Sequence, residues 1–272
     1  MTEAIIHPSA VVETGAKLGI DVVIGPWCHV GADVTIEDGV RLISHVVLDG
    51  ITRIGAGSVL YPFVTVGMAP QDLKYKGEPT RTEIGARCHL REHVTVHRGT
   101  ITGSGLTKVG DDCLLMACVH VAHDCELGHN VVIANNVMLG GHVHIGPYAV
   151  LGGGAAVHQF TRIGRAAMIG GMAGVVADVI PFGTVIGNRA YLAGLNIIGL
   201  RRRGYDRAQI NAVRGAFRLM FMGPGVFDDR VSEAKASYGQ EPLVIEMLEF
   251  ISSCGKRGLT HASAETADDE AA

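Results

Sequence analysis

A branched aliphatic residue recurs at every sixth position through the first two thirds of the chain, and this period constrains the fold more than any other feature. One phase runs from Ile6 to Val66 and returns from Ile84 to Val96. A second phase, shifted by one residue, runs from Val109 to Val175. Gly follows many of these aliphatics, which suits a short strand that points its aliphatic inward and then turns a sharp corner. The period predicts an all-β solenoid of hexapeptide repeats.

Three hexads close one triangular coil of such a solenoid, so residues eighteen apart are expected to stack about 4.8 Å from each other. The composition agrees, because 37 of the 272 residues are Gly and only 5% are aromatic. A stack of aliphatic triangles buries one continuous core without large rings. Neighbours in space can therefore be found by subtracting residue numbers.

Charge and apolar patterning exclude several classes of protein. The formal net charge is −4 and there is no long basic tract, which argues against nucleic acid as the main ligand. The N-terminus lacks the pattern of a signal peptide, and no apolar run reaches membrane-spanning length. We expect a cytoplasmic protein with no stable membrane insertion. The six cysteines form no C-x-x-C pair and are interpreted as structural thiols.

The repeat is interrupted twice and then ends. Polar excursions are expected near residues 67–83 and 98–108, and loops ejected from a rigid scaffold often carry function. Asp206 and Gln209 form a capping-box pattern ahead of an apolar stripe at helical spacing. The sequence therefore predicts a β-solenoid over 1–189, a C-terminal α-helical domain over 190–257 and a small, acidic, disordered tail over 258–272.

The stacking rule brings several of the thirteen histidines together. His123, Gly141 and Gln159 fall in one column, and Asp124 and His142 fall in the next. An imidazole beside a side-chain-free amide resembles half of an acyl-transfer site, since the imidazole can remove a proton and the amide N–H can face an oxyanion. The alternative is a set of satisfied polar groups on a solvated face.

Two other chemistries were weighed for these residues. His89, His93 and His97 have the spacing of a helical metal site, but the hexads place them on strands where they do not converge. Some hexapeptide proteins bind zinc through three histidines between subunits, yet no His-x4-His pair exists here. We therefore expect no metal. Cys125 could form a Cys–His nucleophile with His123, but direct attack on a thioester needs none.

Motifs in both excursions and beyond resemble those of the UDP-N-acetylglucosamine O-acyltransferases, which begin lipid A synthesis. The resemblance spans nearly the whole chain. The motifs are QDLKY (71–75), GEPTR (77–81), VHRGT (96–100), GLTKVG (105–110), HVAHDC (120–125), AVHQF (156–160), NI (196–197) and GLRRRG (199–204).

The resemblance implies a left-handed parallel β-helix that forms a homotrimer with active sites between subunits. It also implies transfer of a (3R)-hydroxyacyl group from acyl carrier protein to the glucosamine 3-hydroxyl of UDP-N-acetylglucosamine, without a cofactor. His123 is then the general base, Asp124 orients it and Gly141 is the oxyanion donor. Gly171 occupies the position that limits acyl-chain length. The implied sugar, phosphate and nucleotide contacts are Asp72, Lys74, His120, His142, His158, Gln159, Asn196 and Arg202.

Two departures from the family pattern and several alternatives remain. Ile198 stands where a carboxylate is expected between Asn196 and Gly199, and Met68-Ala69-Pro70 differs ahead of the first excursion. A related N-acyltransferase would carry an added N-terminal domain, whereas hexads begin here at Ile6. A non-catalytic binding solenoid would not need the histidine beside the glycine. The chain length of the donor, and a 3-hydroxyl or 3-amine acceptor, are left open.

A basic segment is expected to dock the acidic carrier protein. The arginines crowd a short stretch after the repeats, with two more on the solenoid, and a local positive patch can steer an acidic partner even when the whole chain is mildly acidic. The alternative is a solvated helix face. These arginines are Arg201, Arg202, Arg203, Arg207, Arg214, Arg218, Arg162 and Arg165.

Overall fold

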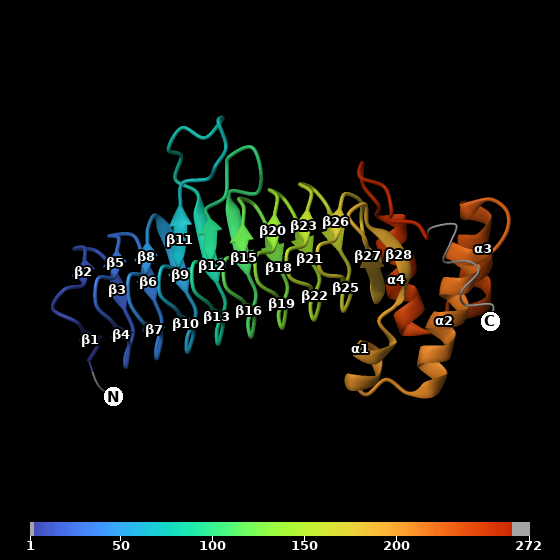
Figure 1. Ribbon diagram of the computed structural model, residues 1–272, viewed down its shortest axis with the longest axis horizontal. Coiled ribbons are helices and arrows are strands. Elements are labelled where there is room, and N and C mark those ends of the chain that lie inside the picture. Colours follow the sequence, from blue (N-terminus) through green and yellow to red (C-terminus); the bar gives the residue numbers. More distant parts are fainter. Residues whose placement is uncertain (1–2, 263–272) are drawn as a thin grey trace.

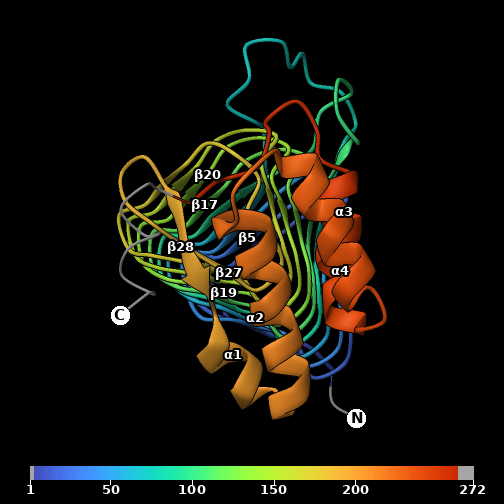
Figure 2. The ribbon, with the colours of Figure 1, turned by 90° about the vertical axis from the view of Figure 1, so that its right-hand side faces the viewer.

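The computed structural model describes residues 3–262 and contains the solenoid that the six-residue period predicts. The chain winds in triangular coils, and the three sides of successive coils stack into three sheets of eleven, nine and eight strands within the described residues. Figure 1 shows the coils side by side along the long axis, and Figure 2 shows the triangular outline along that axis. Most strands are only two residues long.

The first sheet comprises, in spatial order, β1 (Ile5–Ile6), β4 (Val23–Ile24), β7 (Arg41–Leu42), β10 (Val59–Leu60), β13 (His89–Leu90), β16 (Leu114–Leu115), β19 (Val132–Ile133), β22 (Val150–Leu151), β25 (Met168–Ile169), β27 (Gly183–Ile186) and β28 (Tyr191–Leu195). The second comprises β2 (Val11–Val12), β5 (His29–Val30), β8 (Val47–Leu48), β11 (Thr65–Met68), β14 (Thr95–His97), β17 (His120–Val121), β20 (Met138–Leu139), β23 (Ala156–Val157) and β26 (Gly174–Val175). The third comprises β3 (Lys17–Leu18), β6 (Thr35–Ile36), β9 (Ile51–Ile54), β12 (Arg81–Ile84), β15 (Leu106–Val109), β18 (Glu126–Leu127), β21 (His144–Ile145) and β24 (Arg162–Ile163).

The hexad aliphatics form the core because strand pairing keeps them in register. Leu60 pairs with Leu90 and Leu90 with Leu115, although the two excursions separate these residues by more than eighteen positions. All three side chains are fully buried. The excursions therefore leave the stack and return without disturbing it, and one aliphatic column continues along the molecule.

The corners of the coils impose special backbone geometry. Residues in the left-handed region recur at each edge, among them Asp124 (φ 58°), His142 (φ 61°) and Met172 (φ 59°). The glycines after the hexad aliphatics allow the next coil to approach closely. At Gly25, for example, an added Cβ would lie 1.8 Å from the Ile43 carbonyl oxygen, so a side chain does not fit there.

Both excursions leave the same edge of the prism. Residues 69–80 join β11 to β12, and residues 98–105 join β14 to β15, so each connects the second sheet to the third. The two loops project side by side in Figures 1 and 2. The next coil turns the same corner between β17 and β18, at residues 122–125, and it carries His123.

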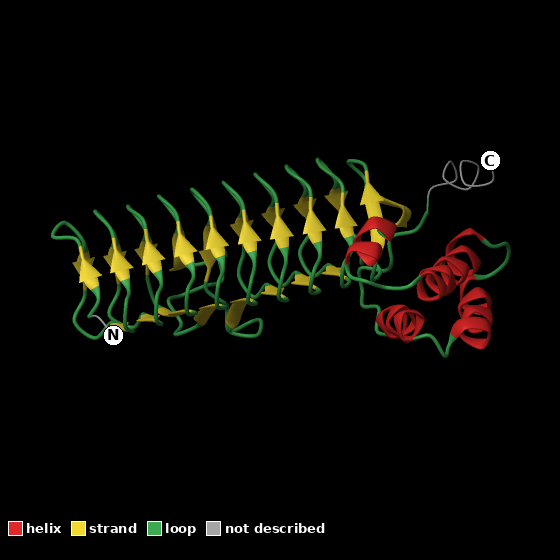
Figure 3. Cartoon of the chain, turned by 90° about the horizontal axis from the view of Figure 1, so that it is seen from below, coloured by secondary structure: helices red, strands yellow, loops and turns green. Residues whose placement is uncertain are grey.

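A hairpin and four helices follow the last coils, and the helices gather at one end of the solenoid (Figure 3). β28 returns antiparallel to β27, and the capping box at Asp206 and Gln209 is confirmed at the start of the second helix. In the described chain no helix is both long and apolar enough to cross a bilayer. The helices are α1 (Ile197–Arg202), α2 (Arg207–Met222), α3 (Phe227–Tyr238) and α4 (Pro242–Ser252).

The beginning of the predicted disordered tail is instead bound to the solenoid. The backbone of Asp178 donates a hydrogen bond to Gly258 and accepts one from Thr260, at 2.9 and 2.8 Å. Thr260 is buried and its hydroxyl donates to Ala177 O. Small polar residues favour disorder, but here the backbone of Asp178 supplies hydrogen-bond partners for this segment. Residues 263–272 lie outside the described part of the chain.

Candidate active site

His123 lies at a corner where its imidazole is oriented by the next residue. Its Nδ1 is 2.9 Å from Oδ2 of Asp124, and the two side chains are 15% and 1% exposed. An ionised carboxylate can only accept, so Nδ1 carries the hydrogen and Nε2 of the neutral ring is left as a base. The predicted pairing of His123 with Asp124 is present.

Asp124 receives further hydrogen bonds from the second excursion. Thr100 donates through its hydroxyl (2.7 Å) and its backbone N–H (3.1 Å), and the Gly105 N–H donates at 3.1 Å. Burial opposes ionisation of this carboxyl group, but the hydrogen bonds from His123 and Thr100 outweigh burial and lower its pKa to about 2. Asp124 is therefore an anion at neutral pH.

Gly141 lies one coil beyond His123, as the eighteen-residue rule predicts. A Cβ added to Gly141 would lie 2.6 Å from Cε1 of the imidazole, so only glycine leaves room for the ring. Within residues 3–262 no hydrogen-bond acceptor is found for the Gly141 N–H. A free amide beside an oriented imidazole is the arrangement needed to bind an oxyanion.

His142 completes the second predicted column. Its ring stacks on Phe160 with centroids 4.3 Å apart and meets the His123 ring edge-on at 5.0 Å. Burial and the neighbouring His123 lower its pKa, while Asp124 and Asp72 oppose that shift. His142 is therefore a neutral group beside the base.

His120 and His97 form an imidazole pair on the other side of His123. The hydroxyl of Thr95 lies 2.7 Å from Nδ1 of His120, and the rings of His120 and His97 meet edge-on at 4.9 Å. His97 is buried, its Nδ1 has no partner among the described residues, and burial lowers its pKa to about 4. Sequence reasoning grouped His97 with a helical metal pattern and missed its place beside His120.

Of the remaining predicted contacts, Lys74, His158 and Gln159 are exposed and Asp72 is partly buried. His158 and Gln159 lie at the equivalent corner one coil beyond Gly141, and both are exposed. On the first excursion Asp72 accepts a hydrogen bond from the backbone of Lys74, whose side chain is free in solvent.

Asn196 and Arg202 lie elsewhere in the single chain. They line a cavity of about 680 Å³ between α1 and the outer face of the first sheet, together with Ile198. His123 belongs to a different edge. Asn196 also caps α1, because its side chain accepts a hydrogen bond from the Gly199 N–H at 2.9 Å. One copy of the chain therefore does not unite all the predicted substrate contacts.

Gly171 lies on the edge between the first and second sheets. An added Cβ there would meet only the Gly153 carbonyl oxygen, at 3.4 Å, whereas a Cβ at Gly170 would lie 2.9 Å from Ile186. The close corner position is thus Gly170, and Gly171 is exposed with room for a side chain. The turn therefore does not require a glycine at position 171.

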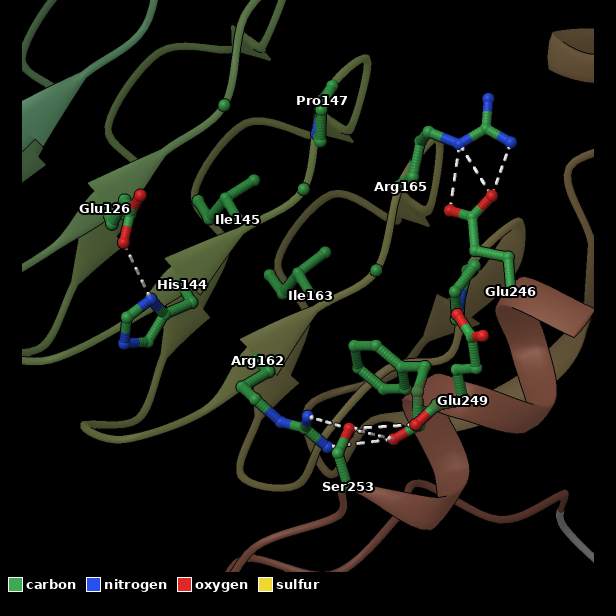
Figure 4. Close-up of a pocket in the computed structure, with 15 residues that line it drawn as sticks. Glu126, His144, Ile145, Pro147, Arg162, Ile163, Arg165, Glu246, Glu249 and Ser253 are labelled. Atoms are coloured by element: carbon green, nitrogen blue, oxygen red, sulfur yellow. Dashed lines mark hydrogen bonds and ion pairs between the residues drawn. The ribbon is translucent and has the colours of Figure 1, made fainter.

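Two of the predicted docking cations are held by internal ion pairs. Arg162 donates to the buried Asp178 at 2.7 Å, and Arg165 is paired with Glu246 on α4. Figure 4 shows both arginines in a cavity of about 600 Å³ between the third sheet and α4, where Glu246 bonds Arg165. Arg201 and Arg202 on α1 and Arg207 and Arg214 on α2 are exposed, so the exposed arginines of this set lie on the helical end rather than on the solenoid.

The other two chemistries find little support in the geometry. His123, Asp124 and His142 bring three potential metal ligands within 4.8 Å of one another, but both carboxylate oxygens already accept hydrogen bonds from Thr100. The Cys125 thiol is buried and donates to Gly140 O, and burial raises its pKa to about 12. A thiol in this state is a poor nucleophile.

Known proteins match most of the length of the chain. Residues 106–141 match the bacterial transferase hexapeptide model, and residues 178–260 match domain 2 of UDP N-acetylglucosamine O-acyltransferase. Acyl-[acyl-carrier-protein]–UDP-N-acetylglucosamine O-acyltransferases of Azorhizobium caulinodans and Bartonella henselae are 49% and 47% identical. The alignments cover 97% of each chain for the first, and 93% of this chain and 92% of the relative for the second.

Solved structures of similar proteins have the same fold as this chain. The UDP-N-acetylglucosamine acyltransferase of Francisella novicida superposes with a TM-score of 0.92 at 30% identity, covering 97% of this chain and 96% of its own. The Acinetobacter baumannii protein gives 0.89 at 40% identity, covering 94% and 100%. The repeat and its helical end thus define a hexapeptide-repeat acyltransferase with a left-handed parallel β-helix. Within that class, the chain belongs to the UDP-N-acetylglucosamine O-acyltransferase family.

Proposed function

We propose that this protein transfers a (3R)-hydroxyacyl chain from acyl carrier protein to the glucosamine 3-hydroxyl of UDP-N-acetylglucosamine, the first step of lipid A synthesis. The observation that carries the proposal is the Nδ1 bond from His123 to Asp124, which leaves Nε2 as a base beside the free Gly141 amide. The printed names of the relatives supply the two substrates.

The reaction is a direct attack on the thioester. Nε2 of His123 takes the proton of the sugar hydroxyl as its oxygen bonds to the thioester carbon. The Gly141 N–H stabilises the tetrahedral oxyanion, which collapses and breaks the carbon–sulfur bond. The imidazolium then returns the proton to the carrier's thiolate. No covalent intermediate on the enzyme forms.

The site of this reaction lies between subunits of a homotrimer, and the sheet faces support this part of the proposal. The outward positions of the third sheet carry alternating charges at Arg53, Glu83, Lys108 and Glu126, which suit solvent. Those of the first sheet are mainly apolar, as the column Leu114, Val132, Val150 and Met168 illustrates. An apolar face on a water-exposed prism favours packing against another copy.

Within one chain Asn196 and Arg202 lie apart from the His123 corner. In the proposed trimer, Asn196 and Arg202 of one copy would approach the His123 corner of the next. The test is to incubate the purified protein with hydroxyacyl carrier protein and UDP-N-acetylglucosamine and to identify the product by mass spectrometry. Acylated sugar nucleotide is expected. Activity only with a 3-amino acceptor would contradict the O-acyl transfer, and no transfer at all would favour a binding solenoid.

A further inference from the structure

The second excursion folds over the carboxylate that orients His123. Thr100 is 2% exposed, and its hydroxyl and N–H both reach Oδ2 of Asp124. The loop also supplies the Ser104 hydroxyl, whose one hydrogen is shared between Leu106 O at 2.9 Å and Oδ1 of Asp124 at 3.3 Å. Gly103 passes so close that an added Cβ would lie 2.4 Å from Cγ of the carboxylate. The loop is therefore shaped around this one anion.

One carboxylate oxygen links the loop to the base. Oδ2 accepts the Thr100 hydroxyl at 2.7 Å and Nδ1 of His123 at 2.9 Å. A carboxylate that shares its charge with a second strong donor attracts the imidazolium less, and the pair of donors fixes the plane of the carboxylate. The threonine hydroxyl therefore influences both the basicity and the orientation of the ring.

We propose that Thr100 is a positioning residue for the reaction, acting through Asp124 to hold His123 in its reactive orientation. This inference rests on the proposed role of His123 as the base. It gives the second excursion a function that none of the sequence motifs indicated. Thr100 itself touches the carboxylate and not the reacting atoms.

The charged and titratable neighbours of this pair set the background for a pH measurement. Asp124 faces His123 and, at 3.9 Å, Nδ1 of His142. The adjacent Cys125 has a pKa raised to about 12 by burial and stays neutral. Beyond the pair, burial and His123 lower the pKa of both His97 and His120, while His144 and Asp72 have opposite effects on the pKa of His142. These groups stay unchanged when only the Thr100 hydroxyl is removed.

The experiment replaces that hydroxyl by a methyl group of equal size. Thr100→Val should lower kcat/KM at neutral pH about tenfold, since one hydrogen bond to a charged group is lost. It should also move the acidic limb of the pH profile upward by about one pH unit, because the carboxylate then holds the imidazolium more strongly. Thr100→Ser keeps the donor and should restore both values.

A matched control and a milder variant guard against a purely structural effect. Thr82 stacks on Thr107 in the adjoining coils and is fully buried, and its hydroxyl has no partner within residues 3–262. Thr82→Val should change neither value. Ser104→Ala removes an exposed residue's longer bond to Asp124 and should produce a smaller upward shift even if Thr100→Val folds poorly.

A second measurement needs no substrate. A histidine reacts with diethyl pyrocarbonate only in its neutral form, so the pH dependence of the modification rate at His123, located by fragment mass spectrometry, gives the titration midpoint of the ring. An upward shift in Thr100→Val or Ser104→Ala supports the positioning role even if the proposed acyl transfer is wrong. An unchanged midpoint in both folded variants overturns it, whatever the enzyme's activity.

Discussion

Two corners of the prism share one backbone geometry and differ in everything that is attached to it. Asp124 and Met172 both adopt left-handed φ values, 58° and 59°, at their respective edges. The corner of Asp124 is covered by an excursion that saturates its carboxylate, and the residue before it is His123. The corner of Met172 is open, and the residue before it is Gly171. The repeat supplies the corner that carries His123, and the covering loop supplies the hydrogen bonds that hold its carboxylate partner.

Replacing His123 by Ala should produce the largest effect of any single change. Loss of the base is expected to lower turnover by about 10²–10⁴ while leaving the trimer folded, because the ring is not part of the aliphatic core. The control is His129→Ala, since His129 holds the matching position before a left-handed residue at another edge and is exposed. Ordinary acyl transfer by a folded His123→Ala protein would remove His123 from the role of base.

A second comparison is between the apolar and charged faces. Val132→Glu places a charge on the first sheet and should disrupt the proposed trimer, because an unpaired charge in an interface costs at least about 3 kcal/mol. Thr35→Glu places the same charge on the third sheet, next to Lys17 and Arg53, and should leave the trimer intact. Light scattering at micromolar concentration measures both. Trimeric Val132→Glu would place the subunit contact on other faces.

The two exposed arginines of α1 can be tested without changing the adjacent Arg203, which has a structural role. Arg201 and Arg202 are exposed, whereas Arg203 donates hydrogen bonds to Tyr148 O and Gly199 O. The double variant Arg201→Ala, Arg202→Ala should therefore raise the KM for the substrates severalfold with little loss of stability. Added salt should raise the KM of the wild type for carrier protein. Kinetics that do not respond to salt would argue against docking by charge.

The smallest expected change concerns the open corner. Gly171→Met should fold, since Gly171 has space for a side chain and no positive φ. We expect the wild type to prefer long hydroxyacyl chains and the variant to prefer shorter ones, with unchanged affinity for the sugar nucleotide. The comparison uses a series of carrier proteins that differ only in chain length. The same preference in both proteins would show that the acyl tail does not reach this edge.

The sequence predicts the solenoid and the columns at the His123 corner because both depend on a fixed period. His123, Gly141 and His142 could be placed by subtraction, since strand pairing preserves the register across the coils. The period says nothing about loops that leave it, so the contact of Thr100 with Asp124 was not foreseen. The hairpin of β27 and β28 and the buried His97 were also missed, because neither follows the repeat.

Charge pairing across distant segments was equally hidden from the sequence. Arg162 and Arg165 were grouped with the docking cations, but Asp178 and Glu246 neutralise them in the folded chain. The separation of Asn196 from His123 also depends on which edge each residue joins. A residue number gives the position along the solenoid axis, and only the fold shows how the C-terminal segment returns to the prism.

The excursions have a consequence for how such a protein can change. Each begins and ends at one corner, and the strands on either side stay paired, as Ile54 with Ile84 and Ile84 with Val109. Added residues at a corner therefore alter the surface of one edge without moving the coils above and below. Proteins with this solenoid can gain, lose or exchange such loops at one edge at a time. New specificities can therefore arise on an unchanged scaffold by insertion rather than by substitution.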